Sequence, residues 1–423
     1  MKYINNLKEI ENRNYLIPSY QEEISKIKSF LVQNSSLSAL YINCSKITDV
    51  EKHYGKKTYL KILNKIQTVI LDMQGEQVRK EDIIVSTDIG SHEFFIFLSN
   101  KREDRDFGST DIETLCDRIS NWLNNSITPV TFSYLRGKPK IDVGYAVVIY
   151  NPLIREERLI NKLMEDAKLM SNYQKFKLMM RDKEKLQELI LKEAIRTVFQ
   201  PIIRLSNNDI IGYEALTRGP EDTEYENPYI LFDIANETDL MFELDRICRK
   251  KALQNAIGLK SHHKLFLNCL PSAVHDPEFK DAYLKSFLED LKINPNNIVL
   301  EITEREAIEN YNLFKEAIKY YADVGFAIAV DDMGAGYSSL ETVVELQPSY
   351  IKIDISIVRD IDKNILKQEL IKAILSLSNK MNAIVIAEGV ETEDESKTLK
   401  QIGIDLAQGF LFAKPSSLFP DNN

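Results

Sequence analysis

Residues 329–339 read Ala-Val-Asp-Asp-Met-Gly-Ala-Gly-Tyr-Ser-Ser, and the fold can be predicted from this stretch outward. An apolar run from Phe326 to Val330 leads into it and is typical of a buried strand. Two adjacent carboxylates, Asp331 and Asp332, end the run, and the glycines behind them allow a sharp turn. Adjacent strand residues point to opposite faces, so both carboxylates can serve one site only if the strand ends here.

A carboxylate pair at a strand end suits a divalent cation, or two cations that share Asp331. The alternative is a solvated turn with a helix cap, because Asp, Gly and Ser all favour turns. The stretch by itself does not decide between these two interpretations.

The same pattern recurs through the C-terminal half of the chain. Seven apolar runs end in a carboxylate, amide or basic side chain, and these endings are Glu214, Asn268, Glu301, Asp331 with Asp332, Lys352 with Asp354, Glu388, and Gln408. Helix-like stretches separate most of the runs, and alternating β and α elements predict a parallel sheet. Functional side chains at the carboxyl ends of strands are typical of α/β barrels, so we predict a barrel with a site at that end.

Composition limits the class of protein. The chain has 423 residues, enough for two or three domains, and is 44% hydrophobic and 28% charged, which is typical of globular proteins. Its net charge of −10 indicates no general nucleic-acid-binding surface. An anionic substrate would therefore need metal ions or local basic groups at its site.

The cysteines and the apolar runs indicate the compartment. The four cysteines contain no CxxC pair, which favours a reducing compartment and argues against structural zinc. No apolar run reaches membrane-spanning length, and the N-terminus lacks the apolar core of a signal peptide. We expect a cytoplasmic protein without direct membrane insertion; association with a membrane through a partner stays open.

The N-terminal half predicts a small α+β domain. Ser19 with Glu22 forms a candidate capping box for a helix over Ser19–Gln33. The elements expected after it are a strand at Leu37–Cys44, a helix at Val50–Met73, strands at Asp82–Ser86 and Glu93–Leu98, a helix at Asp111–Leu123, and strands at Val130–Leu135 and Ile141–Tyr150. The order β-α-β-β-α-β is a ferredoxin-like plan.

The turn between the two central strands carries Gly90-Ser91-His92-Glu93-Phe94, which resembles the GGDEF signature of diguanylate cyclases. Ser91 and His92 stand where that family has Gly and Asp, and Asn43 stands where it has a metal-binding Asp. Loss of these carboxylates removes charge that would hold Mg²⁺ on a triphosphate. The resemblance therefore implies a degenerate, regulatory GGDEF-like domain without cyclase activity, and leaves GTP binding open.

Two further features of this half bear on regulation. Arg79-Lys80-Glu81-Asp82 resembles the RxxD inhibitory site of the cyclases at a shifted spacing, and we favour a solvated loop there. Asn161–Lys177 and Arg181–Arg196 both read as helix, with no Pro, Gly or Ser cluster between the halves, so a stiff helical linker is expected. The expected divisions are residues 1–34 (helical), 35–178 (GGDEF-like), 179–196 (linker) and 197–423 (barrel).

From about Thr197 to Pro415 the chain resembles EAL-domain phosphodiesterases, which hydrolyse cyclic di-GMP to linear pGpG. The signature is Glu214-Ala215-Leu216-Thr217-Arg218, in which Glu214, Leu216 and Arg218 share one face of a strand. A carboxylate for metal and a guanidinium for phosphate thus lie on the same side. The resemblance implies a (β/α)8 TIM-like barrel and a homodimer formed through it.

The resemblance also implies a role for each site residue, with two Mg²⁺ or Mn²⁺ ions per site. The first ion would be held by Glu214, Asn268, Glu301 and Asp331. The second would share Asp331 and add Asp332 and Asp354, with Glu388 completing the site directly or through water. Lys352 would act as general base or orient the attacking water, Gln200, Leu216, Arg218 and Gln408 would contact the dinucleotide, and Glu304 would steady the loop after Asp332.

Purely structural roles are the alternative for several of these residues. Lys352 and Asp354 could form a simple ion pair, and Glu301 and Glu304 could cap a helix. At the level of the whole protein, the alternative is a non-catalytic receptor or scaffold that binds cyclic di-GMP and signals through an unidentified partner. Such receptors should lack some metal ligands, and none is missing from this sequence.

Overall fold

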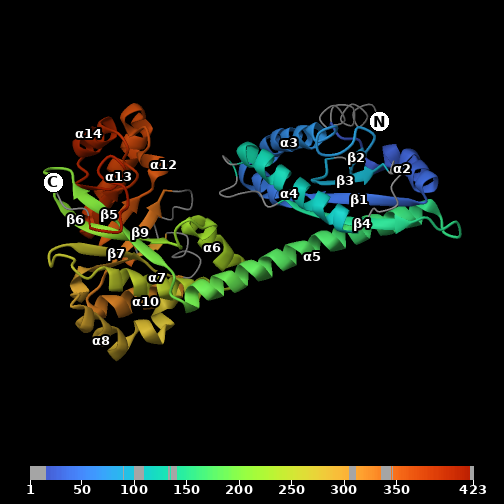
Figure 1. Ribbon diagram of the computed structural model, residues 1–423. Coiled ribbons are helices and arrows are strands. Elements are labelled where there is room, and N and C mark those ends of the chain that lie inside the picture. The colour runs from blue at the N-terminus through green and yellow to red at the C-terminus, as the bar shows by residue number, and fades with distance from the viewer. Residues whose placement is uncertain are drawn as a thin grey trace. The chain divides into compact units, whose positions relative to one another are not determined.

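The structure is a computed structural model that describes residues 16–88, 90–99, 109–131, 134, 141–303, 311–334, 344 and 346–419. The chain divides into two compact units, Met1–Arg181 and Asp182–Asn423 (Figure 1). Among the described residues, no helix is both long enough and apolar enough to cross a lipid bilayer.

The first unit contains a four-stranded antiparallel sheet in the order β2-β3-β1-β4. Its strands are β1 (Ser36–Asn43), β2 (Ile83–Ser86), β3 (Glu93–Leu98) and β4 (Asp142–Ile149), and its helices are α2 (Tyr20–Asn34), α3 (Thr48–Asp72) and α4 (Ser109–Thr131). The elements from β1 to β4 follow the predicted order β-α-β-β-α-β.

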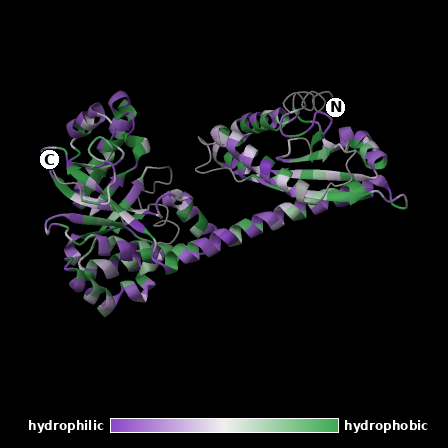
Figure 2. Ribbon diagram, viewed as in Figure 1, coloured by the Kyte–Doolittle hydropathy of each residue, from purple (hydrophilic) through white to green (hydrophobic). Residues whose placement is uncertain are grey.

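Side chains alternate across this sheet and fill a core on each face. Leu40 and Ile42 of β1 pack with residues of α3 and α4, whereas Ala39 and Tyr41 pack with residues of α2 and α5. The strands therefore carry mostly hydrophobic colour in Figure 2, while the helices show hydrophilic stretches along their length.

The predicted helix start at Ser19 is confirmed, because Ser19 and Glu22 form the capping box and the Ser19 amide donates to the Glu22 carboxylate at 2.7 Å. The predicted strand at Val130–Leu135 is wrong at its start, since α4 continues through Thr131. The hydroxyl of Thr131 donates to the Ile127 carbonyl at 3.1 Å, a hydrogen bond to the preceding turn that a threonine can form within a helix. Most of the remaining segment lies outside the described residues.

Helix α5 (Glu156–Leu191) runs through the boundary between the two units as one helix of 36 residues. The two helical segments predicted for this region are thus one element. It ends five residues earlier than predicted, where the Ala194 amide donates to the Leu189 carbonyl and Glu193 adopts a φ of 50°. Arg196 opens the first strand of the second unit instead.

The second unit is a closed eight-stranded barrel in the order β10-β11-β12-β5-β6-β7-β8-β9. Its strands are β5 (Arg196–Arg204), β6 (Ile210–Arg218), β7 (Lys264–Asn268), β8 (Ile298–Thr303), β9 (Ala327–Met333), β10 (Tyr350–Ile353), β11 (Ile384–Ala387) and β12 (Leu406–Ala407). Neighbours from β6 to β12 pair in parallel, as predicted, but β5 is antiparallel to both β6 and β12. A short turn joins β5 to β6 as a hairpin, so no crossover helix separates them.

The barrel is filled with side chains and covered by helices. One buried cluster takes a residue from each of seven strands, namely Ile202, Phe266, Val299, Ala329, Tyr350, Ile386 and Leu406. The outer helices are α6 (Pro228–Glu237), α7 (Met241–Asn255), α8 (Asp281–Leu291), α10 (Tyr311–Val324), α12 (Ile355–Val358), α13 (Ile365–Met381) and α14 (Glu393–Ile402). Because the middle of the barrel is packed, a polar site can form only at its ends.

Candidate active site

Side chains from six neighbouring strands meet at the carboxyl end of the barrel. They come from β6 (Glu214), β7 (Asn268), β8 (Glu301), β9 (Asp331 and Asp332), β10 (Lys352) and the residue after β11 (Glu388). The pairing register places Asn268 directly beside Glu301. Six of the seven strand-end motifs found in the sequence thus converge at one end of the barrel, and the seventh, Gln408 after β12, contacts Glu214.

Lys352 is fully buried at the centre of this group. Its Nζ lies 2.6 Å from Glu388 Oε1, 2.7 Å from Glu301 Oε1, 3.3 Å from Asp331 Oδ1 and 3.6 Å from Glu214 Oε1. One ammonium therefore faces four carboxylates, and the cluster carries an excess of negative charge.

Burial and mutual repulsion act on the pKa of each of these groups. Burial raises the pKa of Glu301 and Glu388 well above the usual range and raises that of Asp331, although Lys352 opposes each shift. Burial also opposes ionisation of Glu214, but Lys352, Gln408 and Asn268 outweigh it and lower its pKa. Burial disfavours a charged Lys352, yet the surrounding carboxylates raise its pKa well above the ordinary value.

Three amide side chains extend the cluster. Asn268 Nδ2 lies 3.3 Å from Glu214 Oε1 and from Glu301 Oε2. Gln408 Nε2 donates to Glu214 Oε2 at 2.6 Å and to Gln200 Oε1 at 2.9 Å. Gln408 Oε1 is buried and accepts no hydrogen bond from the described residues. Of the two glutamines predicted to contact a dinucleotide, Gln408 thus bonds Glu214 directly, and Gln200 bonds Gln408.

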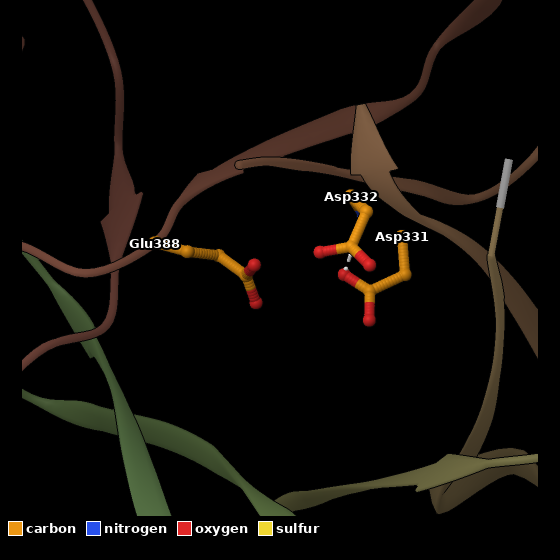
Figure 3. Close-up of side chains that lie close together, drawn as sticks. All are labelled: Asp331, Asp332 and Glu388. Atoms are coloured by element: carbon orange, nitrogen blue, oxygen red, sulfur yellow. Dashed lines mark hydrogen bonds between the residues drawn. The ribbon is translucent and has the colours of Figure 1, made fainter. Parts of the chain in front are cut away.

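Asp331 and Asp332 both contribute to the site although β9 continues through Met333. The register with β10 shifts here, and Asp332 has a φ of 57°, so the strand bulges at the acidic pair. The expectation that the strand must end at these residues is therefore wrong, because a bulge also lets two adjacent side chains reach the same site. Oxygens of Asp331, Asp332 and Glu388 lie within 4.8 Å of one another (Figure 3).

The donor set fits a hard divalent cation. Carboxylate and amide oxygens are the preferred ligands of Mg²⁺ and Mn²⁺. A half-turn of the Asn268 amide would exchange its nitrogen and oxygen and present an oxygen to the cluster. The raised pKa values and the charge excess indicate that a divalent cation would relieve the repulsion among Glu301, Asp331 and Glu388.

The other predicted residues lie around this cluster. Asp354 caps α12, its carboxylate accepting from the Ser356 amide at 2.8 Å, and it does not belong to the oxygen group of Figure 3. Leu216 and Arg218 line a cavity of about 380 Å³ that reaches Asn268 and Glu301. Glu304 lies outside the described residues.

The same cavity is bordered by charged residues that sequence analysis did not single out. Asp245 accepts from Arg249 Nε at 2.7 Å and from the Leu270 amide at 3.2 Å. Arg249 is buried and also donates to Asp276 Oδ2 at 3.0 Å. This network anchors the segment that follows Asn268. The sequence signal was an Asp and an Arg four residues apart on the apolar face of α7.

The residues of the GGDEF-like hairpin have partners within their own unit. Glu93 accepts from the Tyr41 hydroxyl at 2.8 Å and from Lys168 Nζ at 2.5 Å. Burial opposes its ionisation, but these two donors outweigh burial and lower the pKa of Glu93. Asn43 accepts from the Ser45 amide at 2.8 Å, and the Ser91 hydroxyl accepts from the Glu93 amide at 3.0 Å.

The charge run at Arg79–Asp82 is only partly solvated, contrary to expectation. Asp82 is buried, and its carboxylate accepts from the amides of Arg79 at 2.8 Å and Ser99 at 2.7 Å. Asp82 therefore ties this loop to the end of β3, a structural role that local sequence does not reveal.

Comparison with known proteins gives a consistent result. A family model described as the EAL domain matches residues 183–415. The chain is 31% identical over 233 residues to the probable cyclic di-GMP phosphodiesterase PdeB of Escherichia coli, covering 54% of this chain and 44% of PdeB. It is 27% identical over 347 residues to the probable cyclic di-GMP phosphodiesterase PdeN of the same organism, covering 76% of this chain and 64% of PdeN.

Among solved structures, the FimX EAL domain of Xanthomonas citri in complex with c-diGMP matches with a TM-score of 0.54. The identity is 21%, and the match covers 59% of this chain and 99% of the FimX chain. At that identity the likeness concerns the fold. The chain spans less than two thirds of the length of either curated relative.

Proposed function

The chain belongs to the EAL domain family, and from this premise we propose that it hydrolyses one phosphodiester of cyclic di-GMP to give linear pGpG. One observation carries the proposal: four carboxylates surround Lys352 at the carboxyl end of the barrel, with more negative charge than one ammonium can balance. The names of PdeB and PdeN support the choice of substrate.

Two Mg²⁺ or Mn²⁺ ions fit the site in this proposal. One ion would be held by Glu214, Asn268, Glu301 and Asp331. The other would be held by Asp331, Asp332 and Glu388, with Asp354 as a further possible ligand at the strand end. When bound, such ions supply a nucleophilic water and neutralise phosphate oxygens.

Lys352 acts as a charged hydrogen-bond donor in this proposal, not as a base. The carboxylates raise its pKa, so it keeps its charge at neutral pH and can orient the attacking water or stabilise charge on phosphate. Glu388, 2.6 Å from Lys352 Nζ, would be held ionised by a bound cation and is placed to accept the proton of the water. The water oxygen bonds to phosphorus as the P–O3′ bond breaks, and the leaving O3′ takes up a proton from solvent to become the 3′-hydroxyl of pGpG.

Arg218 and the adjoining cavity supply substrate binding in this proposal. The guanidinium of Arg218 offers a planar pair of donors suited to phosphate oxygens. The cavity of about 380 Å³ combines Arg218 with apolar side chains such as Leu216 and Phe232, a lining that suits a nucleobase. Gln408, which donates to Glu214, has a buried Oε1 that accepts no hydrogen bond from the described residues and is an acceptor available to a ligand.

We further propose that the first unit is a degenerate GGDEF-like regulatory domain without cyclase activity. Glu93 is neutralised by Lys168 of α5 and by Tyr41, and Asn43 stands where the cyclases have a carboxylate. We also propose pairing of two barrels as a homodimer, on the resemblance to the family alone.

A receptor that binds cyclic di-GMP without cleaving it is the rival function. The experiment that separates the two is incubation of purified protein with labelled cyclic di-GMP and Mg²⁺ or Mn²⁺, followed by chromatography of the products. Conversion to pGpG supports the phosphodiesterase. Micromolar binding without any conversion under either metal would favour the receptor.

A further inference from the structure

We propose that Ile355 and Ile357 are positioning residues, which fix the separation between the acidic pair Asp331–Asp332 and the carboxylate of Glu388. Both isoleucines belong to α12, the four-residue helix that follows β10. The inference rests on the proposed function only in taking these carboxylates to hold a cation.

Helix α12 is held at both ends. At its start the Asp354 carboxylate accepts from the Ser356 amide at 2.8 Å. At its end Lys367 Nζ, from α13, donates to the carbonyls of Ser356 at 2.7 Å and Arg359 at 2.5 Å. These contacts fix the short helix to the strand before it and to the helix after it.

The chain that enters α12 is bonded to both neighbouring strand ends. The Asp354 amide donates to the Met333 carbonyl at 3.2 Å, on the strand that carries the acidic pair. The Glu388 amide donates to the Ile353 carbonyl at 3.1 Å on the other side. α12 therefore starts at a point that is already tied to both groups of carboxylates.

The two isoleucines occupy the space beside two glycines. Gly334 follows the acidic pair by two residues, with a φ of 97°, and a Cβ there would lie 2.0 Å from Ile357 Cδ1. Gly389 directly follows Glu388, with a φ of 66°, and a Cβ there would lie 2.4 Å from Ile355 Cδ1 and Cγ1. Each isoleucine thus packs against backbone that only glycine leaves open.

This packing blocks movement of both turns toward the isoleucines of α12. Each lies one to three residues from a glycine that an isoleucine contacts, and their oxygens lie within 4.8 Å of one another (Figure 3). Ile357 is 6% exposed and Ile355 is 38% exposed. Shortening either side chain opens space beside a turn, and the turn can then move toward it. That movement would change the distances from a bound cation to the carboxylates of the acidic pair and of Glu388.

The test uses the full chain with Ile357→Val and with Ile355→Ala. Mn²⁺ affinity is measured by electron paramagnetic resonance, and kcat and KM for cyclic di-GMP are measured alongside. We expect Mn²⁺ affinity to fall by about three- to tenfold and kcat to fall more than KM changes, because misplaced ligands impair the reaction more than substrate binding. Ile374→Val is the matched control for Ile357→Val, since Ile374 is buried in the same core cluster as Ile357 and has no atom within 4 Å of a Cβ placed at Gly334.

A double variant tests the specific contact. Gly334→Ala should weaken Mn²⁺ binding through its collision with Ile357 Cδ1, and Ile357→Val removes that atom. The combined variant should therefore lose less Mn²⁺ binding free energy than the sum of the losses in the two single variants. Wild-type affinity in both isoleucine variants, or an equal loss in Ile374→Val, would overturn the proposal.

The positioning role and the proposed function fail in different ways. Wild-type protein that binds Mn²⁺ but converts no cyclic di-GMP would refute the phosphodiesterase, while the affinities of the variants would still test the isoleucines. Wild-type protein that binds no Mn²⁺ would overturn both.

Discussion

Two carboxylate sites, one in each unit, differ in how their charge is balanced. In the first unit Glu93 stands alone and accepts hydrogen bonds from Lys168 and Tyr41. In the barrel, four carboxylates surround Lys352. The charge of Glu93 is thus balanced by groups of the chain, whereas the negative charge around Lys352 exceeds the single positive charge there.

The pKa values respond to this difference in opposite directions. Burial opposes ionisation at both sites, yet Lys168 and Tyr41 leave the pKa of Glu93 lowered. Burial and neighbouring carboxylates leave the pKa values of Glu301, Asp331 and Glu388 raised despite Lys352, whereas the pKa of Glu214, which also has Gln408 and Asn268 as partners, is lowered. The two sites show that an acidic residue at a motif position is not enough to indicate a cation site. The charge of the acidic residues must also be left unbalanced by other groups of the chain.

The largest expected effect is on turnover of cyclic di-GMP by Glu214→Ala. This variant removes one carboxylate from the uncompensated site, and kcat should fall by at least about 100-fold, as loss of a group that stabilises a transition state usually does. Product formation is measured by chromatography. Glu316→Ala, an exposed carboxylate of α10, is the control and should keep wild-type turnover.

Removal of the central ammonium should come next in size. Lys352→Met leaves four carboxylates, three of them buried, without their cation, and the barrel without added metal should lose about 3 kcal/mol of unfolding free energy. Added Mn²⁺ should restore part of that loss, measured by denaturant unfolding. Lys372→Met, on the exposed face of α13, should change stability little. A loss that Mn²⁺ does not reduce would contradict the charge argument.

A smaller effect is expected at the balanced site. Glu93→Gln removes a half-exposed ion pair and should cost about 1 kcal/mol of unfolding free energy at pH 7. Because the folded state lowers the pKa of Glu93, this contribution is present above the unfolded pKa of about 4.3 and lost as pH falls through the folded pKa. The difference from wild type should therefore shrink below about pH 4. Added Mg²⁺ should leave the unfolding free energy of the first unit unchanged in both wild type and Glu93→Gln.

The smallest expected effect is no effect at all: the chain should form no cyclic di-GMP from GTP. With Glu93 paired to Lys168 and an amide in place of a carboxylate at Asn43, these two described positions do not offer the pair of free carboxylates that would hold Mg²⁺ on a triphosphate. The assay follows labelled GTP with the Glu214→Ala variant, so that hydrolysis cannot conceal a product. Any cyclic di-GMP formed would break the comparison.

The sequence predicted most of the barrel site because a polar residue that ends an apolar run is a local signal. Lys352 and Glu388 were found in this way, and the structure brings them within 2.6 Å of each other. The direction of β5 was not predictable, since an apolar run reads alike in either direction. The bulge at Asp332 was missed because it depends on the register with β10.

Residues with mainly tertiary partners were also beyond local signals. Lys168 lies 75 residues from Glu93, and nothing near either residue in the sequence indicates that the two pair. Asp354 was expected to bind metal, and only the geometry of α12 reveals its hydrogen bond to the Ser356 amide. The end of α4 was mistaken for a strand because its β-branched residues also suit strands.

The most direct test of the central claim is calorimetric titration of Mn²⁺ into the full chain, compared with Glu214→Ala and Glu93→Gln. The uncompensated barrel site predicts that Glu93→Gln binds Mn²⁺ as wild type does, whereas Glu214→Ala loses at least about tenfold in affinity. Equal Mn²⁺ affinity in wild type and Glu214→Ala, or a loss in Glu93→Gln, would contradict the account.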